Sequence, residues 1–371
     1  MQRVGDSIAR PRFDFTDGLR ALAAIAVSIY HAALFTGGSG EFLASFPIAG
    51  RLLGLGTLAV PVFIVLSGFV LMLPVARSSS LELRGGLREF VKRRARRILP
   101  PYFISLAIFA TTIGLAPALQ TGHGTEWDSK VPITLGGLVS HLFLVHNLDP
   151  AWIYQINGPA WSVATEWQIY FLFPLVLLPL WRRFGPIVAV GTAIALGVAT
   201  IVLLPSIAPA HPWFLGLFAM GAGAAWMTHH AELRRAGAMT VLAAVIAIVL
   251  TIGVHVVWVS ETACGAAIAL LLYWLSLNAR SGRSTRAARI LSYRPLVRIS
   301  IGSYSLYLVH SPVLAAGNIA LLDLEMPYPA RLLVMFVVVL PLSWLAGWIF
   351  FRLVERHFLT THQAILRPDR S

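Results

Sequence analysis

The sequence has few charged residues, fewer acidic than basic ones, and almost no cysteine. Only 12% of its 371 residues are Asp, Glu, Lys or Arg, whereas a soluble globular domain carries about 25%. So small a charged fraction cannot cover a water-facing surface, which excludes an ordinary soluble domain. The single cysteine, Cys264, excludes an internal disulfide framework.

What the sequence does have is apolar residues and arginine. Hydrophobic residues make up 57% of the chain and the mean hydropathy is +0.75, as in an integral membrane protein. The net charge of +13 would suggest nucleic acid as the partner of a soluble protein. Here the arginines cluster in short loops between apolar runs, so they indicate membrane topology and sites for anionic ligands, and no nucleic-acid partner is expected.

Ten apolar runs are long enough to cross a bilayer, which takes about 20 mostly apolar residues. We predict the spanning helices at residues 18–36, 56–76, 98–116, 165–181, 185–204, 211–228, 237–257, 262–278, 302–321 and 331–353. The first run lacks a small-residue cleavage pattern, so we expect a permanent helix rather than a signal peptide. An eleventh stretch, 133–145, is shorter and contains two glycines and His141.

The positive-inside rule decides whether this eleventh stretch spans the membrane. If it does not, all the basic clusters fall on one side, which the rule identifies as cytoplasmic: 77–97, 181–183, 232–235, 280–298 and the tail from 352. We therefore predict an all-α, polytopic protein with about ten transmembrane helices and one re-entrant or interfacial segment. Residues 1–371 would form a single domain in the plasma or inner membrane, with both termini cytoplasmic.

Two ionisable residues lie in the first predicted helix. Arg20 is near its inner end, and His31 lies about 16 Å further along at 1.5 Å per residue. An ionisable group within a bilayer costs several kcal/mol, so a functional role is the default hypothesis. Their different depths indicate different roles.

The second and third predicted helices carry further signals. Ser67 and Gly68 are equally consistent with close helix packing and with a direct role in a site. The run from Arg88 to Arg97 is consistent with a topology anchor, but arginine also binds phosphate bidentately, so a nucleotide-bearing cofactor is an equal alternative.

Polar residues also begin the fourth predicted helix. Ser162 and Glu166 are four residues apart and share a helical face. Trp161 is typical of an interfacial aromatic belt. A carboxylate one turn into a spanning segment needs a partner or a wet cavity, and the depth of Glu166 predicts pairing with His31.

A second histidine, His310, lies mid-helix three residues after Tyr307. Considered alone, His310 is better explained as a structural hydrogen-bonding residue between helices. The other histidines show no metal-ligand spacing with carboxylates, so no metal site is predicted.

In this order, the motifs resemble the membrane-bound acyltransferase-3 family over nearly the whole chain. They are Asp17-Gly-Leu-Arg20 with His31, Phe63-Ile-Val-Leu-Ser-Gly-Phe69, Arg93-Arg-Ala-Arg-Arg97-Ile-Leu-Pro-Pro-Tyr102, Pro159-Ala-Trp-Ser-Val-Ala-Thr-Glu166 with Tyr170, Tyr304-Ser-Leu-Tyr-Leu-Val-His310-Ser-Pro312, and Val354-Glu-Arg356.

The resemblance implies ten core helices and transfer of an acyl group, commonly acetyl, from cytoplasmic acyl-CoA to an extracytoplasmic carbohydrate or a secondary metabolite such as a macrolide. It implies that Arg20 and His31 form the family's Arg-x10-His pair, and that Arg93 and Arg97 form its Arg-x3-Arg element. Two departures stand out. The usual Tyr-Arg-Pro lead-in is absent before Asp17, and no extracytoplasmic hydrolase-like domain is expected within 1–371.

The resulting hypothesis assigns roles to these residues. Arg20, Arg93 and Arg97 would hold acyl-CoA, the donor substrate. His31 would be the general base on the acceptor hydroxyl, Glu166 would orient its imidazole, and Ser162 could form an acyl intermediate. The residues expected to contact substrate are Trp161, Tyr170, Tyr307 and His310.

Two other classes of protein stay open. In a proton- or ion-coupled transporter, the same buried ionisable groups would form an ion path, although the two halves show no internal repeat. In a scaffold for envelope assembly, His31 and the arginines would tolerate substitution. The acceptor, the acyl chain and the choice between direct transfer and a covalent relay are not determined by these residues.

Overall fold

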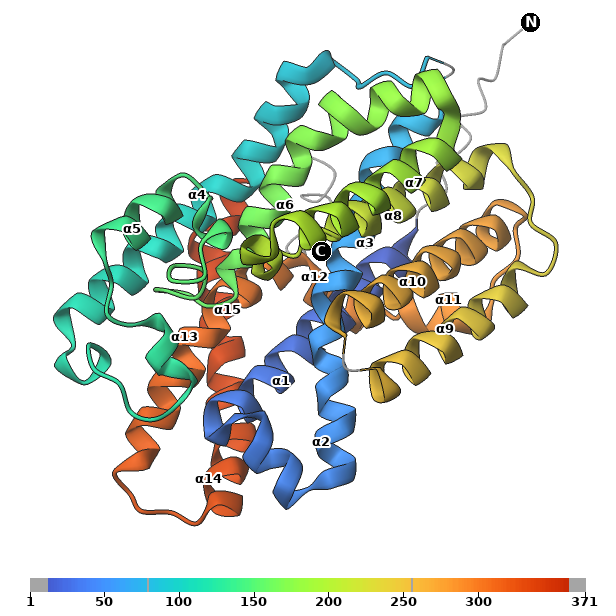
Figure 1. The fold of residues 1–371 in the computed structure, drawn as a ribbon. Coiled ribbons are helices and arrows are strands. Elements are labelled where there is room, and N and C mark those ends of the chain that lie inside the picture. Colours follow the sequence, from blue (N-terminus) through green and yellow to red (C-terminus); the bar gives the residue numbers. More distant parts are fainter. Residues whose placement is uncertain (1–12, 79, 255, 360–371) are drawn as a thin grey trace, which may run out of the picture.

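The computed structural model describes residues 13–78, 80–254 and 256–359, and in this part of the chain the secondary structure is helical, without a strand (Figure 1). The long helices are α1 (Asp14–Ser45), α3 (Ala59–Ala76), α4 (Gly86–Leu115), α6 (Ala160–Leu172), α7 (Leu178–Leu203), α8 (Phe214–His230), α9 (Ala236–Gly253), α10 (Val257–Arg280), α13 (Ser303–Leu322) and α15 (Leu340–Leu353). The shorter ones are α2 (Pro47–Gly54), α5 (Leu135–Leu142), α11 (Arg286–Leu291), α12 (Arg294–Ile301) and α14 (Tyr328–Val334).

Eight helical segments among the described residues are long and apolar enough to cross a membrane. They are Asp14–Gly37, Ile48–Ala76, Gly86–Leu115, Ala160–Leu203, Ala236–Gly253, Val257–Arg280, Ser303–Leu322 and Tyr328–His357. This confirms the prediction of an all-α, polytopic membrane protein.

One of these segments makes two passes. Ala160–Leu203 has 44 residues, about 66 Å of helix and therefore twice the thickness of the hydrocarbon core. The helix is interrupted at Gly185, where φ is 82° and ψ is 177°. Thr165, near the start of α6, donates a hydrogen bond to the carbonyl of Ala210, which follows α7, at 3.1 Å. The chain therefore reverses at Gly185, and the light-green ribbon of Figure 1 doubles back between α6 and α7.

The ten predicted ranges each fall on a helical segment. The reversal at Gly185 separates 165–181 from 185–204, and 211–228 corresponds to α8, whose 17 residues are near the lower limit for a spanning helix. The stretch 133–145 contains only the eight-residue α5, about 12 Å long. It is too short to span, in agreement with the prediction.

Close helix packing at glycines holds α3 and α1, two helices that carry site residues, against their neighbours. A Cβ atom on Gly68 of α3 would lie 2.0 Å from the carbonyl oxygen of Phe218 in α8, and one on Gly221 would lie 2.0 Å from that of Val65. Gly68 therefore has the packing role considered from the sequence. Gly18 similarly allows α1 to contact α11, because a Cβ there would lie 1.6 Å from the carbonyl oxygen of Leu291.

Candidate active site

A small cavity, called here the basic cavity, is enclosed by side chains of α1, α3, α4, α6 and α13. Its volume is about 110 Å³. Its polar lining residues are Arg20, Ser67, Arg94, Arg97, Ser162, Glu166, Tyr170, Ser303, Tyr304 and Tyr307. Three guanidinium groups at one cavity make it suited to a phosphate-bearing ligand.

The arginines of the basic cavity lie among a few buried or half-buried carboxylates. Arg20 forms an ion pair with Asp17, with 3.5 Å between Nη1 and Oδ1. The charges of Arg97 and Glu166 also act on Arg20. Glu355 is 1% exposed and accepts hydrogen bonds from the backbone N–H and the hydroxyl of Ser305, at 2.9 and 2.6 Å. These carboxylates partly offset the positive charge and hold the arginine side of the cavity together.

The structure separates the two arginines that the resemblance assigned to donor binding. Arg97 lines the basic cavity, but Arg93 does not. Arg93 instead donates a hydrogen bond from Nη2 to the carbonyl of Arg84 at 3.0 Å. Its neighbour Arg94, to which the sequence analysis gave no role, takes its place at the cavity.

The structure does not bring Glu166 to His31, although the sequence predicts their pairing. Within the described part of the chain, the Glu166 carboxylate accepts hydrogen bonds from Tyr170, at 2.6 Å, and from Ser67. All three residues line the basic cavity. Glu166 and His31 face different cavities.

A second, larger cavity of about 1150 Å³ contains the predicted base, and is called here the large cavity. Its polar and aromatic lining residues include Tyr30, His31, Phe35, Glu126, Lys130, Tyr154, Trp161, His211, Glu261, Tyr307 and Ser311. The volume is at the upper end of that of ligand-binding pockets, so a bulky acceptor would fit.

His31 is oriented by His310. Nε2 of His310 lies 3.0 Å from Nδ1 of His31, and Nδ1 of His310 lies 2.9 Å from the carbonyl oxygen of Leu306. A carbonyl only accepts, so Nδ1 of His310 carries the hydrogen. With both rings neutral, Nε2 of His310 accepts from Nδ1–H of His31, and this network assigns the free lone pair of His31 to Nε2. That nitrogen is the one suited to take a proton.

The two cavities share part of their walls. Val60 and Tyr307 line both, and Ser162 lines the basic cavity beside Tyr307. The Ser162 and Tyr307 hydroxyl oxygens are 2.6 Å apart, and Tyr307 also donates to the carbonyl of Pro159 at 3.1 Å. Ser162, Tyr307, His31 and His310 are thus brought to one region.

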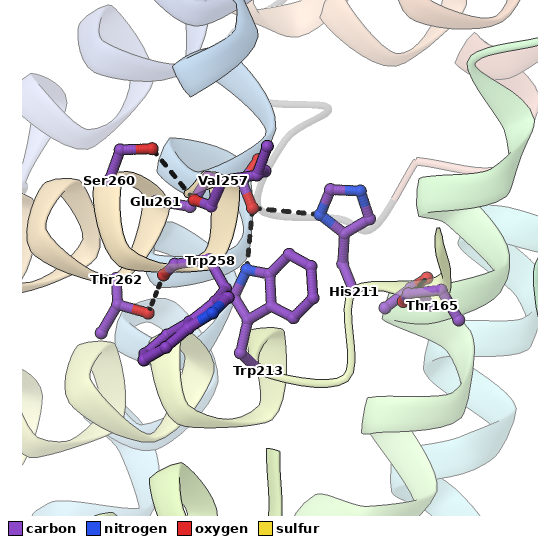
Figure 2. A network of polar contacts seen from close by, with 9 residues as sticks. Thr165, His211, Trp213, Val257, Trp258, Ser260, Glu261 and Thr262 are labelled. Carbon is purple, nitrogen blue, oxygen red and sulfur yellow. Dashed lines mark hydrogen bonds and ion pairs between the residues drawn. The ribbon is translucent and has the colours of Figure 1, made fainter. Parts of the chain in front are cut away.

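Trp161 lies in a polar network at another wall of the large cavity. Its ring stacks on that of His211, with 4.3 Å between the ring centroids. Nδ1 of His211 and Nε1 of Trp213 lie 3.0 and 2.7 Å from the same carboxylate oxygen of Glu261, and Figure 2 shows both rings directed at it. This network joins α10 to the segment before α8 and holds the face of Trp161 in place. Trp161 lines the large cavity, as expected of a substrate contact, whereas Tyr170 lines the basic one.

Sequence reasoning missed Arg94 and Lys130. Arg94 is adjacent to Arg93 in the same run, and the family pattern drew attention to Arg93, whereas Arg94 lines the basic cavity. Lys130 could have been noticed in the sequence by its rarity, because only two of the 29 basic residues are lysines, Lys92 and Lys130.

Comparisons with known proteins identify the family of the chain. A family model described as an acyltransferase domain matches residues 13–348. The acyltransferase MdmB of Streptomyces mycarofaciens is 34% identical over 164 residues, which are 43% of this chain and 37% of MdmB. The O-acetyltransferase OatA of Staphylococcus aureus is 23% identical over 91% of this chain and 56% of its own length. The peptidoglycan O-acetyltransferase OatA of Listeria monocytogenes is 26% identical over 80% of this chain and 49% of its own.

No solved structure matches the chain significantly. The chain spans about half the length, or less, of these curated relatives. The family match nevertheless covers most of the chain, including the helices that enclose both cavities. The chain therefore belongs to the acyltransferase-3 family of membrane acyltransferases.

Proposed function

We propose that this protein transfers an acyl group, acetyl in the simplest case, from acyl-CoA to a hydroxyl group of an extracytoplasmic carbohydrate or glycoconjugate. One observation carries the proposal: a cavity lined by three arginines and a cavity containing an oriented histidine share a wall at Tyr307. This arrangement suits a reaction in which a phosphate-bearing donor and a hydroxyl acceptor approach from different sides. The positive-inside rule assigns the arginine side to the cytoplasm.

The basic cavity would hold part of acyl-CoA. Arg20, Arg94 and Arg97 would bind its phosphates, since guanidinium groups bind phosphate oxygens through paired hydrogen bonds. The cavity is far smaller than a whole CoA molecule, so the nucleotide would remain at its mouth and only the thioester arm would enter. The thioester carbonyl would then reach the wall at Tyr307.

His31 would activate the acceptor from the large cavity. Its Nε2 takes the hydroxyl proton while the acceptor oxygen attacks the thioester carbonyl carbon. The carbon–sulfur bond breaks, the CoA thiolate leaves, and the proton passes from His31 to the thiolate. His310 keeps the base in the required tautomer, as the third member of a catalytic triad does.

Direct transfer is favoured over an acyl-serine intermediate. A nucleophilic serine needs a base within hydrogen-bond reach. The hydrogen-bond partners of the Ser162 side chain in the described structure are Tyr307 and the Pro159 carbonyl, neither of which is an imidazole or a carboxylate. Ser162 is better placed to position Tyr307 at the wall between the cavities.

A secondary metabolite is the second candidate acceptor. The large cavity has apolar walls from Val27, Leu34, Phe35, Leu53 and Ile252, which suit a bulky amphipathic molecule. The similarity to MdmB supports the same idea. Family membership does not support the transporter and scaffold alternatives.

Acetyl-CoA turnover by purified protein in nanodiscs tests the proposal. Thiol release in the presence of crude envelope glycans should be lost in His31→Ala and kept in His123→Ala, because His123 lines neither cavity. CoA should raise the thermal midpoint of all three proteins. Equal thiol release from wild type and His31→Ala would contradict the proposed base, and an absent CoA effect on wild type would contradict the donor site.

A further inference from the structure

Lys130 is an ammonium group buried beside the large cavity. It ends the short helix η3 (Glu126–Lys130), and only 6% of its surface is exposed. Its Nζ donates hydrogen bonds to the carbonyl of Glu126, at 3.0 Å, and to the hydroxyl of Ser129. Both partners are neutral, and no carboxylate of a described residue lies within ion-pair distance of Nζ. A buried charge without an ionic partner is costly, which suggests that it is kept for a ligand.

The position of Lys130 relates it to the base. Its Nζ lies 5.6 Å from the centre of the Phe35 ring and 5.5 Å from that of Tyr154. The ring of His31 lies 6.5 Å from the same Phe35 ring. Because His31 and Phe35 are four residues, or roughly 6 Å, apart along α1, Lys130 borders the same part of the large cavity as the base.

We propose that Lys130 binds an anionic group, a carboxylate or phosphate, of the acceptor whose hydroxyl reaches His31. This inference rests on the proposed acyl transfer and specifies its acceptor: a negatively charged glycoconjugate rather than a neutral one. Two of the three N–H donors of Lys130 are used within the protein, which leaves the third for an acceptor oxygen.

The other charges at the cavity are consistent with this assignment. Glu261 is satisfied by His211 and Trp213. Glu126 lines the cavity as well and acts on Lys130 through its charge, but burial has the larger effect and lowers the pKa of Lys130 to about 8. Lys130 is therefore mostly protonated at pH 7 and can still be labelled as an amine near pH 8.

Reductive methylation with formaldehyde, read by mass spectrometry, tests the site without any turnover. Lys92 provides the control within the same chain, because its side chain is 73% exposed. Trigalacturonate should slow the methylation of Lys130 severalfold and leave Lys92 unchanged. Maltotriose, a neutral trisaccharide of similar size, should protect neither at the same concentration and ionic strength. Equal protection of Lys130 by both sugars, or protection by neither, would overturn the proposal.

Substitutions give a second measurement. Lys130→Met should weaken trigalacturonate binding, measured as a thermal shift, by about tenfold or more, as expected for loss of a charge-assisted hydrogen bond. Lys130→Arg should retain most of it. CoA should stabilise both variants, which shows that they are folded. Unchanged trigalacturonate binding in Lys130→Met would refute the role of Lys130. If trigalacturonate protects Lys130 from methylation but CoA does not stabilise the protein, only the proposed donor is refuted.

Discussion

Replacement of His310 tests whether His31 works as an oriented base. His310→Phe removes the acceptor at 3.0 Å from Nδ1 of His31 while keeping a ring of similar size. The Nδ1–H of His31 would then lose its side-chain acceptor and keep only the weaker contact with the Val27 backbone, or the ring would change tautomer and lose its free Nε2. A buried, unsatisfied donor costs about 1–3 kcal/mol. We therefore expect kcat to fall by roughly 5- to 150-fold.

His310→Gln separates orientation from packing. The amide oxygen of glutamine can reach the region occupied by Nε2 of His310 and accept the same hydrogen bond, so this variant should be more active than His310→Phe. The base itself should matter more, because loss of a general base lowers the rate by about 10²- to 10⁴-fold. His31→Ala should therefore be the least active single variant.

The assay is thiol release from acetyl-CoA with an envelope-glycan acceptor, at saturating donor. KM for acetyl-CoA should change little in either His310 variant, since His310 does not line the basic cavity. Adding His310→Phe to His31→Ala should cause no further loss, because the two residues act as a unit. Wild-type activity in His310→Phe, or additive losses in the double variant, would refute this reasoning.

Three further predictions concern the donor site, acid stability and packing. Arg94→Ala should raise KM for acetyl-CoA about tenfold. Arg93→Ala should not, because Arg94 lines the basic cavity and Arg93 does not. Equal effects of the two substitutions would contradict that assignment. Burial lowers the pKa of His146 to about 3, below the value of about 6.5 in an unfolded chain. The unfolded state therefore binds more protons below pH 6.5, and the thermal midpoint should fall with pH there less steeply in His146→Phe than in wild type. Gly68→Ala should prevent recovery of folded protein, whereas Gly114→Ala should be tolerated, since a Cβ meets nothing within 4 Å at Gly114; equal recovery would show that α3 and α8 can separate.

The fold could be predicted from the sequence because spanning helices are local features. A run of about 20 apolar residues must satisfy its backbone hydrogen bonds within itself once it is in lipid. The chain reversal at Gly185 was also predictable, since the sequence has Gly185 and Pro186 between two basic residues and the next apolar run. Such signals need no knowledge of which helices are neighbours.

The site could be predicted only in part, because sequence gives depth along a helix but not the direction a side chain faces. Arg93 and Arg94 differ by one position and hence by about 100° around α4, so helix rotation decides which one reaches the cavity. Glu166 and His31 were paired by depth alone and face different cavities. The partner of His31 is 279 residues away in sequence, and only the packing of α1 against α13 brings it near.

The wall at Tyr307 gives a physical reason for two cavities instead of one. CoA is large and highly charged, so moving it across the hydrocarbon core would leave its phosphates without solvation. With arginines on one side of the wall and His31 on the other, only the acyl group needs to cross. In the proposed reaction, the donor would remain where guanidinium groups solvate its phosphates, and the acceptor would remain where Lys130 and the aromatic walls are proposed to bind it. A larger side chain at the wall, as in Tyr307→Trp, should block the transfer of the acyl group without weakening the binding of either substrate. A single open channel would not show this separation of transfer from binding.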